Sequence, residues 1–131
     1  MDPKLKIVLP WPNPELSPNA RIHWAKKKNL IYAARTEAFY ETKNQIEINV
    51  IDEAKDLLKN RNNKIEINYL FLKNKKGQQQ DIDNLIASMK SSLDGIFDAL
   101  ESNDKRIHKM TGNKIFTSKN SKVIVLVRIL R

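Results

Sequence analysis

The chain has 131 residues, of which 40% are hydrophobic, so it can bury the core of one domain without a metal or a disulfide. It has no cysteine, which excludes disulfides, thiolate metal sites and thiol catalysis and suits a reducing compartment, so we expect a cytoplasmic protein. A formal net charge of +9 favours a polyanionic partner, either a nucleic acid or an acidic membrane surface.

The N-terminal half predicts one strand, a proline-rich segment and two helices. Residues 4–9 (KLKIVL) alternate between polar and apolar and predict a strand. Four of the five prolines fall within residues 10–18, so we expect this segment to be extended. Residues 21–43 favour a helix. Residues 46–59 fit two patterns, because IEINV alternates like a strand while VIDEAKDLLK has helical spacing, and we favour a helix.

The C-terminal half predicts three strands and one further helix. Residues 64–72 predict a strand with one apolar face, formed by Ile65, Ile67, Tyr69 and Phe71. A basic, flexible loop follows at 73–80, and a helix begins with DIDN and ends near Ser102. Residues 106–116 and 122–130 predict two more strands, the last apolar enough to be central in its sheet.

This order of elements predicts a single α/β (α+β) domain that spans residues 1–131. We expect a mixed sheet of about four strands with two or three helices on it. The most apolar run, VIVLV at 123–127, is too short to cross a bilayer, so we expect neither a signal peptide nor a membrane span.

Acidic residues concentrate between positions 78 and 104 of this basic chain. The segment carries one base, Lys90, and six acids, Asp81, Asp83, Asp94, Asp98, Glu101 and Asp104. On a helix, four of these charged residues lie within about 20° of a common line: Asp83, Lys90, Asp94 and Glu101. The apolar side chains of the helix lie to one side of that line, which places the acidic stripe at the margin of the core.

Two interpretations of these acids remain open. In the first, Asp81 and Asp83 only cap a helix, and Lys90 and Asp94 form a surface ion pair. This leaves Asp104 unexplained, and the helix dipole disfavours acids near a C-terminus. In the second, Asp81 and Asp83 present oxygens to Mg²⁺, and Asp104 completes the site. A metal held in this way can activate water and neutralise charge on a scissile phosphate.

Two motifs resemble the RusA family of Holliday junction resolvases. The acidic segment contains, in order, DIDN at 81–84, Lys90, Asp94-Gly95 and Asn103-Asp104. The start of the chain, LPWPNPELSPNARIHWAKK at 9–27, is similar to the family's proline-rich opening, its Asn-Ala-Arg and its following His-Trp. The resemblance therefore covers a start and a catalytic segment in the expected order.

The resemblance implies a bacterial or phage-encoded homodimer that binds four-way DNA junctions and makes paired nicks with Mg²⁺, or with Mn²⁺ in its place, and with no small-molecule cofactor. The family's essential aspartates carry over to Asp81, Asp83 and Asp104, and Asp94 supports them as a metal ligand. The catalytic lysine of some members falls at Ala87 here. Lys90, about one turn later, is therefore the candidate that stabilises the phosphate or the leaving group. A two-fold dimer suits a junction, which has two equivalent strands to cut.

Basic residues outside the acidic segment are candidates for DNA contact. We predict such contacts for Arg21, Lys26, Lys27, Lys28, Lys73, Lys75 and Lys76, although the first four also suit a solvated helix start. Trp11 can wedge into an unstacked junction, but we favour packing on its own domain or on a partner. His23 is more typical of a structural residue than of a general base. A basic dimer that binds branched DNA without cutting it is the alternative function, and a nuclease acting on flaps or forks is the third.

Overall fold

Alternating apolar residues build the four strands of one mixed sheet. The computed structural model describes residues 3–76 and 80–131. The strands are β1 (Lys4–Pro10), β2 (Lys64–Asn74), β3 (Ile107–Thr117) and β4 (Lys122–Leu130), arranged in the order β1-β4-β2-β3. β4 runs antiparallel to both β1 and β2, while β2 and β3 are parallel. The predicted strands and the central place of the last one are confirmed.

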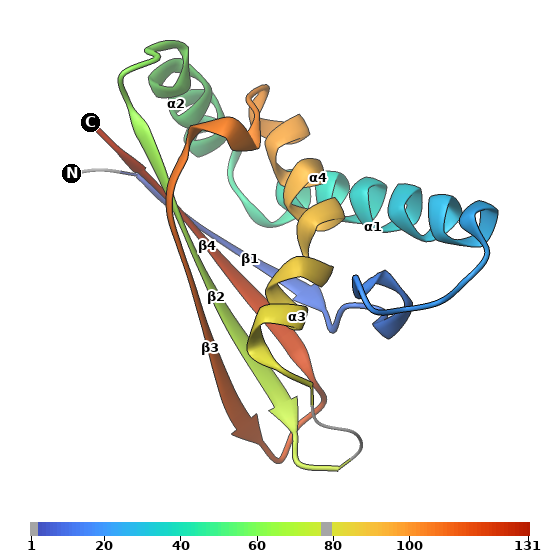
Figure 1. Cartoon of the computed structure of the whole chain (residues 1–131). Coiled ribbons are helices and arrows are strands. Elements are labelled where there is room, and N and C mark those ends of the chain that lie inside the picture. The colour runs from blue at the N-terminus through green and yellow to red at the C-terminus, as the bar shows by residue number, and fades with distance from the viewer. Residues whose placement is uncertain (1–2, 77–79) are drawn as a thin grey trace.

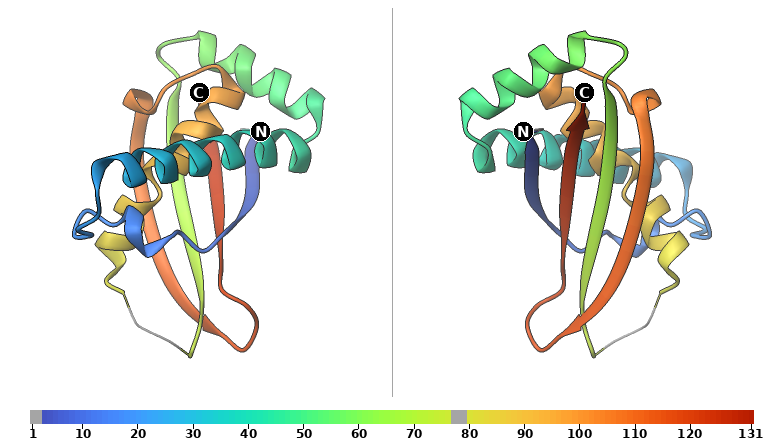
Figure 2. Two further views of the ribbon diagram at one scale, coloured as in Figure 1. Left: turned by 90° about the vertical axis from the view of Figure 1, so that its right-hand side faces the viewer. Right: turned by 90° about the vertical axis from the view of Figure 1, so that its left-hand side faces the viewer.

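One face of this sheet carries the core. Figure 2 shows the helices on one side of the sheet and the other side uncovered. Residues on the helix-facing side alternate along β1, β2 and β4, and each is at most 3% exposed: Leu5, Ile7, Leu9, Ile65, Ile67, Tyr69, Phe71, Val123, Val125, Val127 and Ile129. Such a one-sided core is the usual consequence of period-two alternation in a sheet with helices on a single face.

The first two helices form where the sequence predicts them. α1 spans Trp24–Gln45 and α2 spans Ile48–Lys59, so the ambiguous stretch after residue 46 is helical. α1 crosses α4 closely at Gly95, where a Cβ atom would overlap the backbone carbonyl oxygen of Arg35. The proline-rich segment is not fully extended, because a short 3₁₀ helix, η1 (Pro14–Leu16), forms where the Asn13 side chain accepts the Glu15 N–H at 2.9 Å.

The prediction of one continuous helix from DIDN to Ser102 is wrong. The segment forms two helices, α3 (Ile82–Ser88) and α4 (Lys90–Leu100), which meet at the buried Met89. The Ser88 hydroxyl donates to the Asn84 carbonyl oxygen at 2.7 Å, and such bonds to the preceding turn bend helices. The described residues thus form four α-helices rather than two or three.

The predicted α+β architecture with a mixed four-stranded sheet is confirmed. The chain is a single α+β domain in which α4 and α1 lie over the sheet, and a short 3₁₀ helix, η2 (Asp104–Arg106), leads from α4 into β3 (Figure 1). Within the described residues, no helix is both long enough and apolar enough to cross a membrane. The homodimer stays a prediction.

Candidate active site

The start of α3 lies against the proline-rich segment. The Trp11 indole N–H donates to the Gln80 side-chain oxygen at 3.0 Å, across 69 residues of chain. The Asn19 amide donates to the Asn84 side-chain oxygen at 3.3 Å. The two motifs behind the family resemblance, which are distant in sequence, therefore form one region of the structure.

A lysine that the sequence analysis did not select also holds this region. Lys114 of β3 donates from Nζ to the Gln80 carbonyl oxygen at 2.8 Å, next to Asp81. Lys114 pairs in register with the buried Phe71, so it lies on the helix-facing side of the sheet. Lysine is rare at strand positions that face the core, so the alternation of residues along β3 could have marked Lys114 as unusual.

Trp11 packs on its own domain, as predicted. Its ring meets the Phe71 ring edge-to-face with centroids 5.9 Å apart, and the Lys73 ammonium lies 5.6 Å from its centroid. Together with the bond to Gln80, these contacts fix both the end of β2 and the residue before Asp81. Trp11 is therefore a positioning residue for the start of α3, and it is held by its own chain.

Asp81 and Asp83 are exposed, and Asp81 does not cap the helix as the first interpretation requires. Asp81 occupies the N-cap position of α3, yet its carboxylate makes no capping hydrogen bond. The Asp83 carboxylate accepts the neighbouring Asn84 N–H, at 2.9 Å. A hollow of about 320 Å³ lies beside Asp81 and is lined by Pro14, Ser17, Asn19, Ala20, Gln80 and Asn84. Both carboxylates are thus exposed at the start of α3, and that of Asp81 lies beside a polar hollow.

Lys90 joins the other two predicted site aspartates. Its Nζ donates to Asp94 Oδ1 at 2.8 Å and also to Asp104 Oδ2. The expected pair of Lys90 and Asp94 is confirmed, and Asp104 is added to it. The bonds to Asp104 and then to Asp94 raise the pKa of Lys90, and the bond from Lys90 lowers the pKa of Asp104. Lys90 and Asp104 are therefore both charged at neutral pH.

Arg106 fixes the turn that carries Asp104. Its guanidinium donates to the carbonyl oxygens of Leu58, Asn60 (2.5 Å) and Asn63 (3.0 Å), at the junction of α2 and β2. η2, with Asp104 as its first residue, is thereby held against the end of α2. Arg106 could not be found from the sequence, because nothing in the local pattern shows that distant carbonyl groups converge on it.

The remaining acids of the segment have structural partners. Asp98 receives two hydrogen bonds from the Arg35 guanidinium, at 2.6 and 2.8 Å, which lower the pKa of Asp98. Glu101 pairs with Lys55 of α2 at 2.6 Å. These ion pairs with α1 and α2 account for two acids near the C-terminus of α4, where the helix dipole is unfavourable.

The predicted metal ligands do not form one cage in this chain. The described ranges contain no group of three or more His, Cys, Asp or Glu side chains placed to share a metal ion. Between Asp94 and Asp104, a metal would compete with the Lys90 ammonium. Mg²⁺ usually takes one or two protein carboxylates and fills its other positions with water and phosphate, so the donor chemistry of Asp81 and Asp83 suits it. The ligand roles stay predictions.

The predicted DNA contacts fall into two groups near this region. Arg21 and Lys26–Lys28 lie at the start of α1, where Lys26 is paired with Glu15 at 2.9 Å. Lys73, Lys75 and Lys76 lie at and after the end of β2, and Lys73 Nζ donates to the Lys76 carbonyl oxygen at 3.0 Å. The loop predicted at 73–80 includes residues 77–79, which lie outside the described part. His23 caps α1 through Nδ1, which accepts the Ala25 N–H at 3.2 Å, and this is a structural role.

Comparison with known proteins gives one short similarity. No protein-family model matches the chain. A stretch of 29 residues is 48% identical to an uncharacterized protein of Xylella fastidiosa (strain Temecula1 / ATCC 700964). This similarity covers 22% of the present chain and 19% of that protein, so the matched stretch spans about a fifth of the relative's length. The name of that protein carries no activity that could be compared.

Proposed function

We propose that this protein is a Mg²⁺-dependent, structure-specific endodeoxyribonuclease that resolves Holliday junctions by paired symmetric nicks during DNA recombination and repair. The observation that carries the proposal is that Asp81 and Asp83 are both exposed at the start of α3, with no capping bond from Asp81. In a chain of net charge +9, carboxylates without a cation would repel DNA. A divalent ion at this pair removes that conflict.

The residues around the pair have distinct roles in this proposal. Asp81 and Asp83 would hold Mg²⁺ or Mn²⁺, which supplies activated water and neutralises charge at the scissile phosphate. Trp11 and Lys114 hold Gln80 and so orient Asp81. Lys90 offers a cation to a phosphate, while Asp94 and Asp104 keep it protonated and in place. The basic groups at the start of α1 and the end of β2 bind the DNA backbone.

The proposal includes a cytoplasmic homodimer. Two equivalent strands must be cut in a junction, and a two-fold protein presents two equivalent sites to them. The uncovered face of the sheet offers a surface for the second copy (Figure 2). Across its centre runs an apolar row of half-buried residues from three neighbouring strands: Val8, Ile124 and Leu70.

One observation favours the alternative, a basic dimer that binds branched DNA without cutting it. Within the ranges that the structure describes, no three acidic or histidine side chains gather to hold a metal, and Lys90 already pairs with Asp94 and Asp104. In this alternative the acidic segment serves only the fold, through its ion pairs with Arg35, Lys55 and Lys90.

A synthetic four-way junction separates the two functions. The protein is incubated with the junction and with a linear duplex of the same arm sequence, in EDTA, Mg²⁺ or Mn²⁺, and the strands are separated on a denaturing gel. We expect symmetric nicks in two opposing strands of the junction, with either metal, and no nicks in the duplex. Intact strands at every metal concentration, together with selective binding of the junction, would instead establish the binding module.

A further inference from the structure

The side of α1 that packs on α4 continues along the helix beyond α4, toward the N-terminus of α1. Positions seven residues apart on a helix return to within about 20° of the same direction. Trp24, Ile31 and Ala38 follow this interval, and their exposure falls from 71% to 39% to 1% along the helix. Figure 1 shows the N-terminal turns of α1 extending past α4. The direction that is buried at Ala38 is therefore open to solvent at Trp24.

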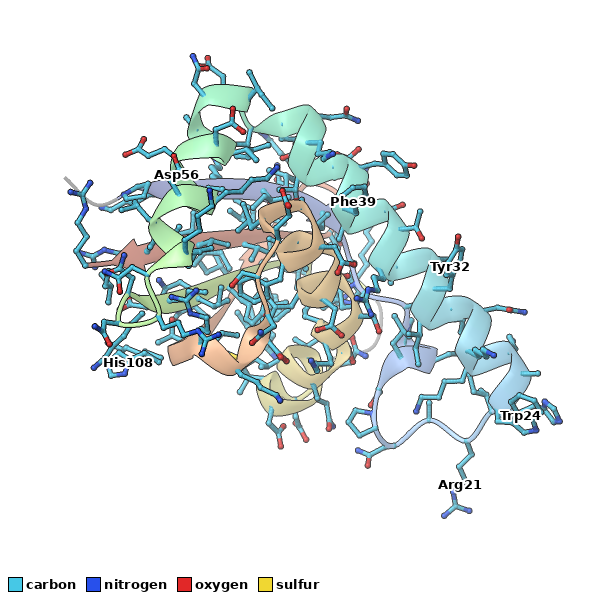
Figure 3. The ribbon with its side chains drawn as sticks, turned by 90° about the horizontal axis from the view of Figure 1, so that it is seen from above. Arg21, Trp24, Tyr32, Phe39, Asp56 and His108 are labelled. Carbon is cyan, nitrogen blue, oxygen red and sulfur yellow. The ribbon has the colours of Figure 1, made fainter. Side chains whose placement is uncertain are left out.

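The exposed end of this side of α1 is surrounded by cations. Arg21 and Lys28 are exposed and Lys27 is half-buried within one turn of Trp24. Figure 3 shows Arg21 and Trp24 at the far end of α1, away from the sheet. The His23 ring stacks on the indole with centroids 5.7 Å apart and planes 29° apart, and His23 also caps the helix. The indole is thus held at the helix start while most of its surface faces solvent.

We infer that Trp24, with Arg21, Lys27 and Lys28, forms a stacking site for unpaired DNA bases. Proteins that bind single strands combine a cationic path for the phosphates with aromatic rings on which bases stack, and this combination tolerates any sequence. A hydrophobic protein partner would have to bury or displace these cations, at a cost.

This inference rests on the proposed function for its substrate class, because branched DNA exposes unstacked bases at its branch point. It goes further because it assigns base stacking to Trp24 and not to Trp11. The Trp11 indole donates a hydrogen bond to Gln80 and packs on Phe71. The basic start of α1 then binds backbone phosphates while the indole binds a base. Phosphate binding alone would depend on the lysines and not on the ring.

Fluorescence of the full chain without metal tests the stacking site. In a Trp11→Phe background, Trp24 is the remaining tryptophan, and its emission is followed during titration with a 20-nucleotide oligo-dT strand. We expect quenching on binding. By fluorescence anisotropy of a labelled strand, Trp24→Ala should weaken binding about tenfold, and Trp24→Phe should retain most of it. Tyr40→Ala, at a ring that is 59% exposed on the same helix, is the matched control and should bind like the parent.

The outcomes separate this inference from the proposed function. If Trp24→Ala binds oligo-dT and the junction as the parent does, the stacking site is overturned. If Trp24→Ala instead converts a dimer into a monomer in light scattering, this side of α1 is a contact between copies and the inference is again overturned. If the parent neither prefers nor nicks the junction while Trp24→Ala still loses oligo-dT binding, the inference stands and the proposed function fails. Circular dichroism confirms that each variant is folded.

Discussion

The two acidic groups of the candidate site differ in how their charge is balanced. Asp81 and Asp83 are exposed at the start of α3, and Asp81 makes no capping bond. Asp94 and Asp104 share the Lys90 ammonium. Both groups come from one acidic segment, yet only the first is left for a cation from solution. Carboxylates are therefore candidate metal ligands where the fold places no Lys or Arg side chain against them, whatever their spacing in sequence.

Replacing one ligand of the first group should give the largest effect. Asp83→Asn should lower the rate of junction nicking by at least about a hundredfold, because several kcal/mol of charge stabilisation at the phosphate is lost. Junction binding should stay equal or become tighter, since a charge that repels phosphate is removed. Gel-based nicking in Mg²⁺ and a binding titration in EDTA measure the two quantities on one preparation.

Asp56→Asn is the matched control for this variant. Asp56 lies on α2, paired with Lys59 at 3.2 Å, and its side chain is 75% exposed. It changes the net charge equally, so nicking and binding should match the parent. Loss of both nicking and binding in Asp83→Asn would indicate misfolding, and unchanged nicking would remove Asp83 from the proposed site.

Removing the Lys90 ammonium should leave Asp94 and Asp104 without a paired cation, like Asp81 and Asp83. Lys90→Met leaves Asp94 and Asp104 facing each other without compensation, which should lower the free energy of unfolding by about 1–2 kcal/mol. Millimolar Mg²⁺ should then raise the melting temperature of Lys90→Met more than that of the parent, because two uncompensated carboxylates bind a cation in the folded state only. Thermal unfolding with and without Mg²⁺ measures both effects.

Lys59→Met serves as the comparison for Lys90→Met. Lys59 pairs with the exposed carboxylate of Asp56, whereas Lys90 pairs with two aspartates. Its loss should cost no more than about 0.5 kcal/mol and should leave the Mg²⁺ response unchanged. Equal Mg²⁺ responses in the parent and in Lys90→Met would show that Asp94 and Asp104 do not act as a pair.

The smallest expected effect is on acid stability. Lys90 lowers the pKa of Asp104 below its ordinary value of 3.8, so Asp104 stabilises the fold above that value and loses this effect as the pH falls through the lowered pKa. The contribution of Lys90, whose pKa is raised, is constant in this acidic range. The unfolding free energies of the parent and Asp104→Asn should therefore differ by up to about 1 kcal/mol at pH 7 and converge near pH 2. A constant difference across urea titrations at these pH values would contradict the ion pair.

Much of the architecture could be predicted from local pattern. Alternation along 64–72 identified one strand, because a residue facing the core must be apolar at every second position. The apolar run at 122–130 identified another and its central place in the sheet. The prediction that one side of the acidic segment faces the core is also confirmed, since Leu85, Met89, Leu93 and Ile96 are buried. The break at Met89 was missed because the bond from Ser88 to the previous turn leaves the helical periodicity intact.

The candidate site was only partly predictable. The spacing of Lys90 and Asp94 predicts their ion pair, because residues four apart share a helix face. Asp104 joins them through the turn after α4, and Arg106 fixes that turn by bonds to carbonyl groups more than 40 residues away. Such contacts leave no periodic trace in the sequence.

Residue type and short-range spacing were enough to predict the strands, the first two helices, the excess of positive charge and the position of the acidic segment. Contacts between distant segments bring Trp11, Asn19 and Lys114 to the start of α3. They also place Asp104 beside Lys90 and Asp94. The interaction energy of two charges weakens with the distance between them in space, and the fold alone sets that distance.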